Sequence, residues 1–200
     1  MKLAIIKYNA GNIQSVINAL ERLGVEAEIT NEAERITTAD KVIFPGVGEA
    51  SSAMQSLREN GVDKLIPQLK QPVLGICVGM QLLCEFSEEN DTPCLGIVPL
   101  RVKRFGQMQD DAGLPLKVPQ VGWNTIFDLQ SPLFAGIAPD SYVYNVHSYY
   151  VEDDRFTIAR CNYGINYAAA IQKDNFYGVQ FHTEKSAEVG DRIIRNFLDL

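Results

Sequence analysis

Histidine and cysteine are too few and too scattered in this sequence to indicate a metal site. Only two histidines occur in 200 residues, and the four cysteines form no CxxC pair. Neither residue type shows the short ligand spacings of zinc sites or a disulfide framework. The residues concerned are His147, His182, Cys77, Cys84, Cys94 and Cys161. We therefore expect no metal and no other cofactor.

Clusters of basic residues and long apolar runs are also missing. The chain has 18 basic and 25 acidic residues, a net charge of −7, and its lysines and arginines are scattered. This pattern argues against nucleic acid and anionic membranes as partners. No run approaches the roughly 18 apolar residues of a membrane span, and the apolar run near the start is too short for a signal peptide. We expect a cytoplasmic protein.

The composition that remains is that of a globular domain with a full core. Hydrophobic residues make up 46% of the chain and charged residues 22%, without low-complexity tracts. A chain of this length fits one domain, and no segment is long enough to act as a linker. We expect residues 1–200 to form a single domain.

Apolar strands alternate with amphipathic helices in the N-terminal half. Strand patterns occur at residues 2–8, 25–30, 41–46 and 72–77, and helix patterns at 11–24, 49–60 and 78–86, with a polar segment between the second and third strands. Continuous apolar strands separated by helices predict an α/β fold with a mostly parallel sheet covered on both faces. Ligands of such sheets bind at the carboxyl ends of the strands.

The C-terminal half, from about Thr92, predicts short strands added in antiparallel fashion. A hairpin turn is expected at residues 174–175. An amphipathic helix closes the chain, with Val189, Ile193, Ile194, Phe197 and Leu198 facing inward.

Cys77 stands between two glycines where a buried strand passes into a helix, in the segment "LGICVGMQLL". This is the nucleophile-elbow pattern with sulfur in place of the serine oxygen. The glycines at 75 and 79 remove Cβ atoms that would collide with neighbouring elements. The N–H of Val78 is then free to bind an oxyanion. A buried core cysteine in an ordinary turn remains the alternative.

A cysteine nucleophile in acyl transfer needs a base that exchanges protons near neutral pH, which indicates histidine. His182 ends the alternating run "FYGVQF", and in an extended chain Glu184 shares its face. Cys77, His182 and Glu184 then form a candidate triad. The alternative is an interior histidine beside a solvated glutamate. His147 lies in an aromatic-rich strand end, which favours a structural or partner-contact role.

The segments "GICVGMQLL" and "GVQFHTEKS" resemble those of class I, triad-type glutamine amidotransferases. "YNAGNIQSV", "PGVGEA", "KVPQVGWN" and "YNVHSYY" narrow the resemblance to the glutaminase subunits of imidazole glycerol phosphate synthase. It spans essentially the whole chain. It implies a flavodoxin-like domain that hydrolyses glutamine to glutamate and ammonia. It also implies a heterodimer with a (β/α)8-barrel cyclase subunit, which uses the ammonia to make imidazole glycerol phosphate and aminoimidazole carboxamide ribotide in histidine biosynthesis.

The resemblance also assigns roles to residues. Cys77 would form the glutamyl thioester, His182 would shuttle the proton and Glu184 would orient His182. Gly46, Val47 and Gly48 match the oxyanion strand, whose peptide flip would complete the oxyanion hole with Val78; glycines on both sides of Val47 tolerate the positive φ of such a flip. The residues matched to glutamine contacts are Gln81, Glu89, Ser148 and Tyr149. Those matched to the cyclase interface are Asn12, Trp123, Asn124, Tyr144 and Lys185.

Two positions depart from the family pattern. Thr183 replaces the proline that commonly follows the catalytic histidine, and Gln120 replaces a histidine often found before the "GWN" segment. Two other functions stay open. A glutaminase of the pyridoxal phosphate synthase type would carry a Gly-Gly-Glu-Ser loop where this chain has "PGVGEA". A non-catalytic binding or regulatory domain would have no physical need for all three triad residues.

Overall fold

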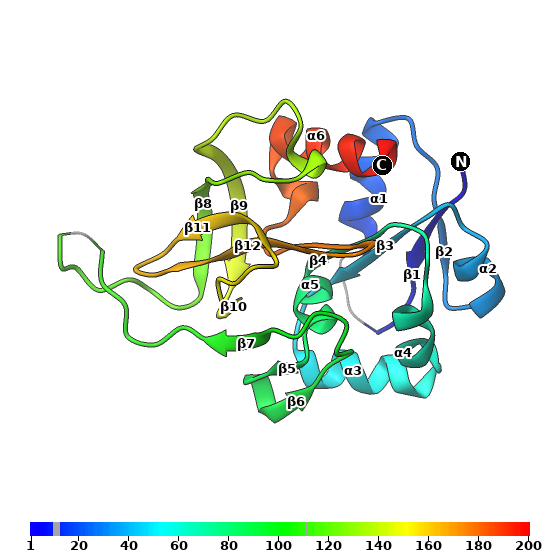
Figure 1. Cartoon of the computed structure of the whole chain (residues 1–200), viewed down its shortest axis with the longest axis horizontal. Helices are drawn as coiled ribbons and strands as arrows, with labels where there is room; N and C mark the ends of the chain where they lie inside the picture. The colour runs from blue at the N-terminus through cyan, green and yellow to red at the C-terminus, as the bar shows by residue number, and fades with distance from the viewer. Residues whose placement is uncertain (10–12, 111) are drawn as a thin grey trace.

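A large mixed sheet forms the centre of the molecule, with helices on both faces (Figure 1). The computed structural model describes residues 1–9, 13–110 and 112–200. Five strands of this sheet are parallel and adjacent, in the order β2-β1-β3-β4-β13. Their bounds are β1 Leu3–Ile6, β2 Glu28–Thr30, β3 Lys41–Gly46, β4 Val73–Cys77 and β13 Phe176–Val179. Every residue of β1, β3, β4 and β13 is buried, as expected of parallel strands covered on both faces.

The parallel register brings three strand ends to one edge of the sheet. Gly46 at the end of β3 pairs with Cys77 at the end of β4. On the other side of β4, Val179 of β13 pairs with Ile76, so the residues that follow β13 come up beside Cys77. Because ligands of α/β sheets bind at the carboxyl ends of the strands, this edge is the expected place for a site.

Helices cover both faces of the parallel strands. Figure 1 shows α1 (Ile13–Arg22) and α6 (Ala187–Asp199) on one face and α3 (Ala50–Glu59) and α5 (Val78–Leu83) on the other. The remaining helices of the described residues are α2 (Ala33–Thr37), α4 (Val62–Leu65) and the short 3-10 turns η1 Ile66–Gln68, η2 Glu89–Asp91, η3 Pro132–Phe134 and η4 Thr183–Lys185. Across the described parts of the chain, none of the helices has the length and apolar character needed to cross a membrane.

Antiparallel strands extend the sheet beyond β13, as predicted. β12 (Asn166–Lys173) and β13 form the expected hairpin around Asp174, and β12 also pairs with β10 (Tyr149–Val151) and β11 (Thr157–Asn162). Three further strands complete that end: β7 (Arg101–Arg104), β5 (Phe86–Ser87) and β6 (Thr92–Pro93). β8 (Gln120–Ile126) and β9 (Ser141–His147) pair with each other in a separate two-stranded sheet.

Some elements differ from the sequence-based expectation. The polar segment before β3 contains the helix α2, whose one buried side chain, Ile36, gives too weak a period to be recognised. α5 ends at Leu83, although a helix was expected to continue to residue 86. Cys84 turns to extended geometry, and the Glu85 N–H donates to the carbonyl of Leu100. In the closing helix, Val189 and Leu198 are only partly buried.

Candidate active site

Cys77 occupies a strained turn between β4 and α5. Its φ of 54° and ψ of −112° lie outside the usual region for a side-chain-bearing residue. A Cβ atom on Gly79 would lie 1.9 Å from the carbonyl oxygen of Phe44 in β3, and one on Gly75 would lie 2.8 Å from the backbone of α5. The predicted reason for the two glycines is thus confirmed, since both allow close backbone approach at the elbow.

His182 and Glu184 form a buried pair beside this elbow. The Nδ1 atom of His182 lies 2.7 Å from Oε1 of Glu184, and both side chains are almost completely buried. The expectation that they share a face of an extended strand is wrong, because β13 ends at Val179. Glu184 instead lies in the 3-10 turn η4, and that turn carries its carboxylate back to the imidazole. With Nδ1 held by Glu184, Nε2 is the ring atom left for the sulfur.

The two histidines have opposite electrostatic surroundings. Burial lowers the pKa of His182, but its interactions with Cys77 and Glu184 outweigh burial and raise the pKa to about 10. Burial lowers the pKa of His147 to about 4, against the hydrogen bond of its Nδ1 to the Tyr149 carbonyl. His182 is therefore protonated at neutral pH and His147 is neutral. The structural role expected for His147 fits its burial against Phe105 and Tyr167.

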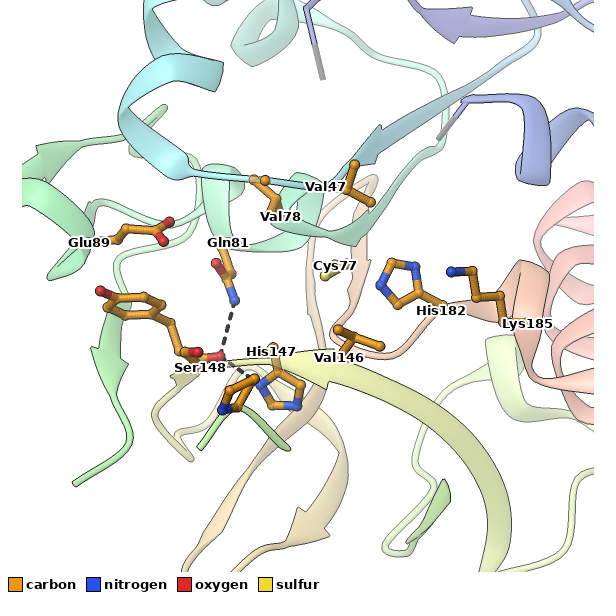
Figure 2. A pocket seen from close by; sticks show the side chains of 13 residues that line it. Val47, Cys77, Val78, Gln81, Glu89, Val146, His147, Ser148, His182 and Lys185 are labelled. Carbon is orange, nitrogen blue, oxygen red and sulfur yellow. Dashed lines mark hydrogen bonds between the residues drawn. The ribbon is translucent and has the colours of Figure 1, made fainter. Parts of the chain in front are cut away.

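A cavity of about 350 Å³ opens above Cys77, a size suited to a small ligand. Figure 2 shows Gln81 and Glu89 toward one end of it and His182 and Lys185 toward the other, with Cys77 between them. The residues that line it are Val47, Gly48, Cys77, Val78, Gln81, Glu89, Pro119, Val146, His147, Ser148, Tyr149, His182 and Lys185. All four residues expected to contact glutamine therefore share one cavity with Cys77 and His182.

The expected oxyanion strand borders the same cavity, but its two glycines serve different purposes. Gly48 has a φ of +96°, which only glycine adopts easily. Gly46 is required for space, since a Cβ there would lie 2.6 Å from the N atom of Gly79 and from the hydroxyl of Tyr8. The expectation that both provide conformational freedom holds for Gly48 alone. Gly46 lies outside the cavity lining, whereas Val47, Gly48 and Val78 belong to it.

Gln81 and Glu89 are both anchored by the protein. The side-chain amide of Gln81 donates to the carbonyl of Tyr149 at 3.2 Å and to Oε1 of Gln180 at 2.9 Å. Oε2 of Glu89 accepts from the N–H of Ala50, at the start of α3, at 2.7 Å. Desolvation raises the pKa of Glu89, and the Ala50 hydrogen bond opposes this rise. The Ala50 N–H at the N-terminus of α3 offsets part of this rise, and burial remains the larger effect.

Sequence reasoning missed two buried side chains next to Cys77. The amide of Gln180 lies 3.8 Å from Sγ of Cys77, and the hydroxyl of Tyr8 donates to the carbonyl of Pro45, just before the oxyanion strand. Gln180 continues the β13 pattern and Tyr8 follows β1, so both resemble ordinary core positions in the sequence. The parallel order of β1, β3, β4 and β13 was the only available signal, since it places the ends of these strands at one edge.

Comparisons with known proteins agree with this geometry. The sequence model of "Glutamine amidotransferase class-I" matches residues 4–200. The imidazole glycerol phosphate synthase subunit HisH of Bacteroides fragilis is 58% identical over the full length of both chains, and that of Haemophilus influenzae is 46% identical over 100% of this chain and 98% of its own. The chain belongs to the HisH family of class-I glutamine amidotransferases. The fold is that of a solved glutamine amidotransferase, with a TM-score of 0.75 at 18% identity over 100% and 98% of the two chains.

The resemblance to this family is therefore confirmed, and so is the flavodoxin-like fold class. The roles assigned to individual residues of this HisH-family chain rest on the geometry. Of the residues expected at a subunit interface, Trp123 and Tyr144 pack edge to face on neighbouring strands, with ring centroids 5.7 Å apart. Lys185 is exposed at the cavity. The side chain of Asn124 instead donates to the carbonyl of Asn162 within the chain. Asn12 lies outside the described residues.

Both departures from the family pattern are buried. Gln120 accepts a hydrogen bond from the hydroxyl of Tyr167 at 3.0 Å and so has an internal role in this HisH-family chain. Thr183 is fully buried, and its hydroxyl has no hydrogen-bond partner among the described residues. Threonine at position 183 leaves the His182–Glu184 contact intact. Burial of its unpaired hydroxyl lowers the free energy of unfolding instead.

Proposed function

We propose that this chain hydrolyses glutamine to glutamate and ammonia at Cys77 and supplies the ammonia to a (β/α)8-barrel cyclase subunit in histidine biosynthesis. The observation that carries the proposal is that Cys77 and His182 line one cavity while Glu184 holds the other side of the His182 imidazole. The strained elbow presents the sulfur, and the 2.7 Å contact to Glu184 orients the imidazole. Relatives named as subunits of imidazole glycerol phosphate synthase support the pathway.

The geometry supports a two-step acyl transfer. The Cys77 thiolate attacks the side-chain amide carbon of glutamine, and the N–H of Val78 together with the Val47–Gly48 segment stabilises the oxyanion. Protonated His182 gives its proton to the departing nitrogen, so that the C–N bond breaks and ammonia leaves. Neutral His182 then takes a proton from water, which attacks the thioester and releases glutamate. Glu184 holds the imidazole in the required orientation throughout.

The end of the cavity away from His182 carries the negative charge that would recognise the ammonium group of glutamine. The carboxylate of Glu89 is complementary to the α-ammonium group of the substrate. Gln81, Ser148 and Tyr149 provide neutral polar groups beside it. We assign these four residues to binding the amino-acid end of glutamine, while the side-chain amide points toward Cys77.

An exposed apolar face next to the cavity supports the partner assignment. Trp123 of β8 and Tyr144 of β9 are paired across the two-stranded sheet, and so are Val121 and Val146. Trp123 and Val121 are 53% and 60% exposed, which is unusual for large apolar side chains. Val146 both belongs to this face and lines the cavity. A subunit docked there would cover the cavity mouth and receive the ammonia.

The same face is joined directly to the catalytic loop. The His182 N–H donates to the carbonyl of Tyr144 at 2.9 Å, and the Tyr144 N–H donates to the hydroxyl of Ser186 at 2.9 Å. A partner that moves β9 therefore moves the loop that carries His182. We propose that glutamine hydrolysis depends on the cyclase subunit for this reason, with Lys185 at the rim and Asn12 and Asn124 as further interface candidates.

Two other functions fit the observations less well. A pyridoxal phosphate synthase-type glutaminase is disfavoured by the "PGVG" segment and by relatives of a different name. A non-catalytic domain would not require the strained φ of Cys77, which costs free energy without adding to the core.

The test compares wild type with Cys77→Ala in complex with the cyclase subunit. Wild type should release glutamate only when the cyclase and its nucleotide substrate are both present. Cys77→Ala should lose glutaminase activity but keep the cyclase reaction driven by added ammonia. Glutamate release by Cys77→Ala would overturn the proposal, and loss of the ammonia-driven reaction would assign Cys77 a structural role instead.

A further inference from the structure

The buried amide of Gln180 contacts the sulfur of Cys77. Its Nε2 atom lies 3.8 Å from Sγ, within hydrogen-bonding reach of a sulfur acceptor. Gln180 is completely buried, and its backbone N–H continues the antiparallel ladder by donating to the carbonyl of Ala169 at 2.8 Å. A polar side chain so deep in the core needs partners for both ends of its amide.

The neighbouring hydrogen bonds fix which end of that amide faces the sulfur. The backbone carbonyl of Tyr149 can only accept, so Gln81 must present its NH₂ group there. The same NH₂ group lies 2.9 Å from the Gln180 side chain, which must therefore present its oxygen. The nitrogen of Gln180 is then directed to Cys77. The orientation of both side-chain amides is therefore fixed by the backbone carbonyl of Tyr149, which can only accept a hydrogen bond.

We propose that Gln180 is a fourth catalytic residue. Its side-chain amide donates a hydrogen bond to the Cys77 thiolate and stabilises the thiolate before it attacks glutamine. This inference rests on the proposed glutaminase function and adds a second donor to the sulfur beside the imidazole of His182. Donors held rigidly toward a charged atom stabilise it strongly in a buried site. The relay from Tyr149 through Gln81 also links a substrate contact to the nucleophile.

The charged and titratable groups around Cys77 come from several elements. His182 and Glu184 approach from the loop after β13, Tyr8 from the loop after β1, and Lys185 and Glu89 line the cavity. Burial and the nearby Cys77 raise the pKa of Tyr8, so this side chain stays neutral. Its hydroxyl donates a hydrogen bond to the carbonyl of Pro45. The carboxylate of Glu89 is held by Ala50. Unlike the imidazole of His182, the amide of Gln180 does not ionise, so it can donate a hydrogen bond to the sulfur at every pH.

The experiment measures the pH dependence of Cys77 alkylation by iodoacetamide on the full-length chain, read as the mass of the Cys77 peptide. Only the thiolate reacts, so the midpoint of the profile reports its stability. Reading the Cys77 peptide separates it from the other three thiols; burial raises the pKa of Cys161 to about 11 and that of Cys94 to about 12.

Two variants and one control make the test specific. Gln180→Met keeps the length of the side chain and removes the donor, so the midpoint should rise by about one pH unit, which is a tenfold loss of alkylation rate at pH values well below the midpoint. Gln180→Glu places a carboxylate beside the sulfur and should raise the midpoint further. The control is Gln172→Met. Gln172 lies on β12, and its partly buried side-chain amide accepts a hydrogen bond from the hydroxyl of Ser131, so the alkylation profile of this variant should match that of wild type.

The kinetics separate the possible roles of Gln180. In the complex with the cyclase, Gln180→Met should lower kcat for glutamine hydrolysis more than it raises KM, while the ammonia-driven cyclase reaction stays at the wild-type rate. An unchanged alkylation midpoint in both Gln180 variants would overturn the inference, as would a rise in KM alone. Absence of glutamine hydrolysis in wild type would instead overturn the proposed function, whatever the alkylation profiles show.

Discussion

At the scale of single residues, the site depends on how buried polar atoms are paired. His182 has Glu184 on one ring nitrogen, and Gln180 has Gln81 at its oxygen and Cys77 at its nitrogen. Each of these groups would be costly to bury alone. Two buried atoms in this neighbourhood have no hydrogen-bond partner among the described residues, the hydroxyl of Thr183 and Oε2 of Glu184.

The orphan hydroxyl gives a prediction about stability. Thr183→Val keeps the shape of the side chain and removes the unpaired group, so the free energy of unfolding should rise by about 1 kcal/mol. The measurement is urea denaturation at neutral pH. Thr92→Val is the matched control, because the hydroxyl of that buried threonine donates to the carbonyl of Glu89 at 2.6 Å and its loss should destabilise by a similar amount. Equal destabilisation by both variants would contradict this account.

At the scale of elements, the close packing of β3, β4 and α5 positions Cys77, the proposed nucleophile. α5 begins directly after Cys77, and its first turn contacts β3 because Gly79 has no side chain. The same contact sets the position of the Val78 N–H, the proposed oxyanion donor. Tyr8 holds the adjacent end of β3 through the carbonyl of Pro45.

Gly79→Ala tests this packing. The added methyl would overlap the carbonyl of Phe44, so α5 must move away from β3. We expect a loss of about 1–3 kcal/mol in the free energy of unfolding together with a fall in glutaminase kcat. The control is Gly106→Ala, where the methyl meets no atom within 4 Å. Wild-type stability and kcat in Gly79→Ala would refute the packing argument.

The sequence predicts these elements to different degrees. The buried strands and the elbow at Cys77 have strong local signals, an apolar run and two closely spaced glycines. α2 does not, because one buried residue in five leaves no visible period. The contact between His182 and Glu184 was predicted for the wrong reason, since spacing alone does not distinguish an extended strand from a 3-10 turn. The role of Gln180 depends on which strands are neighbours, information that no local pattern carries.

At the scale of the whole molecule, the active site and the apolar face of β8 and β9 form one continuous region. Val146 belongs to both. The backbone of Tyr144 accepts from the N–H of His182 and donates to the hydroxyl of Ser186. Such an arrangement allows a docked subunit to seal the cavity and to adjust the catalytic loop at the same time.

Trp123→Ala should therefore weaken cyclase binding. A central aromatic anchor of an interface typically contributes about 2 kcal/mol, so the Kd should rise roughly 30-fold. Titration calorimetry with the cyclase subunit measures this change. Ile29→Ala is a suitable control, because Ile29 is an exposed apolar residue on β2, an edge strand of the large sheet, whereas Trp123 lies in the separate sheet of β8 and β9. Equal affinities for wild type and Trp123→Ala would place the interface elsewhere.

The central claim is that Cys77 is a nucleophile activated for glutamine. It is tested most directly by treating the complex of this chain and the cyclase, with its nucleotide ligand, with a glutamine-analogue diazoketone and measuring the mass of the Cys77 peptide. We predict one covalent adduct, located on Cys77 and prevented by excess glutamine. An unmodified Cys77 under these conditions would contradict it.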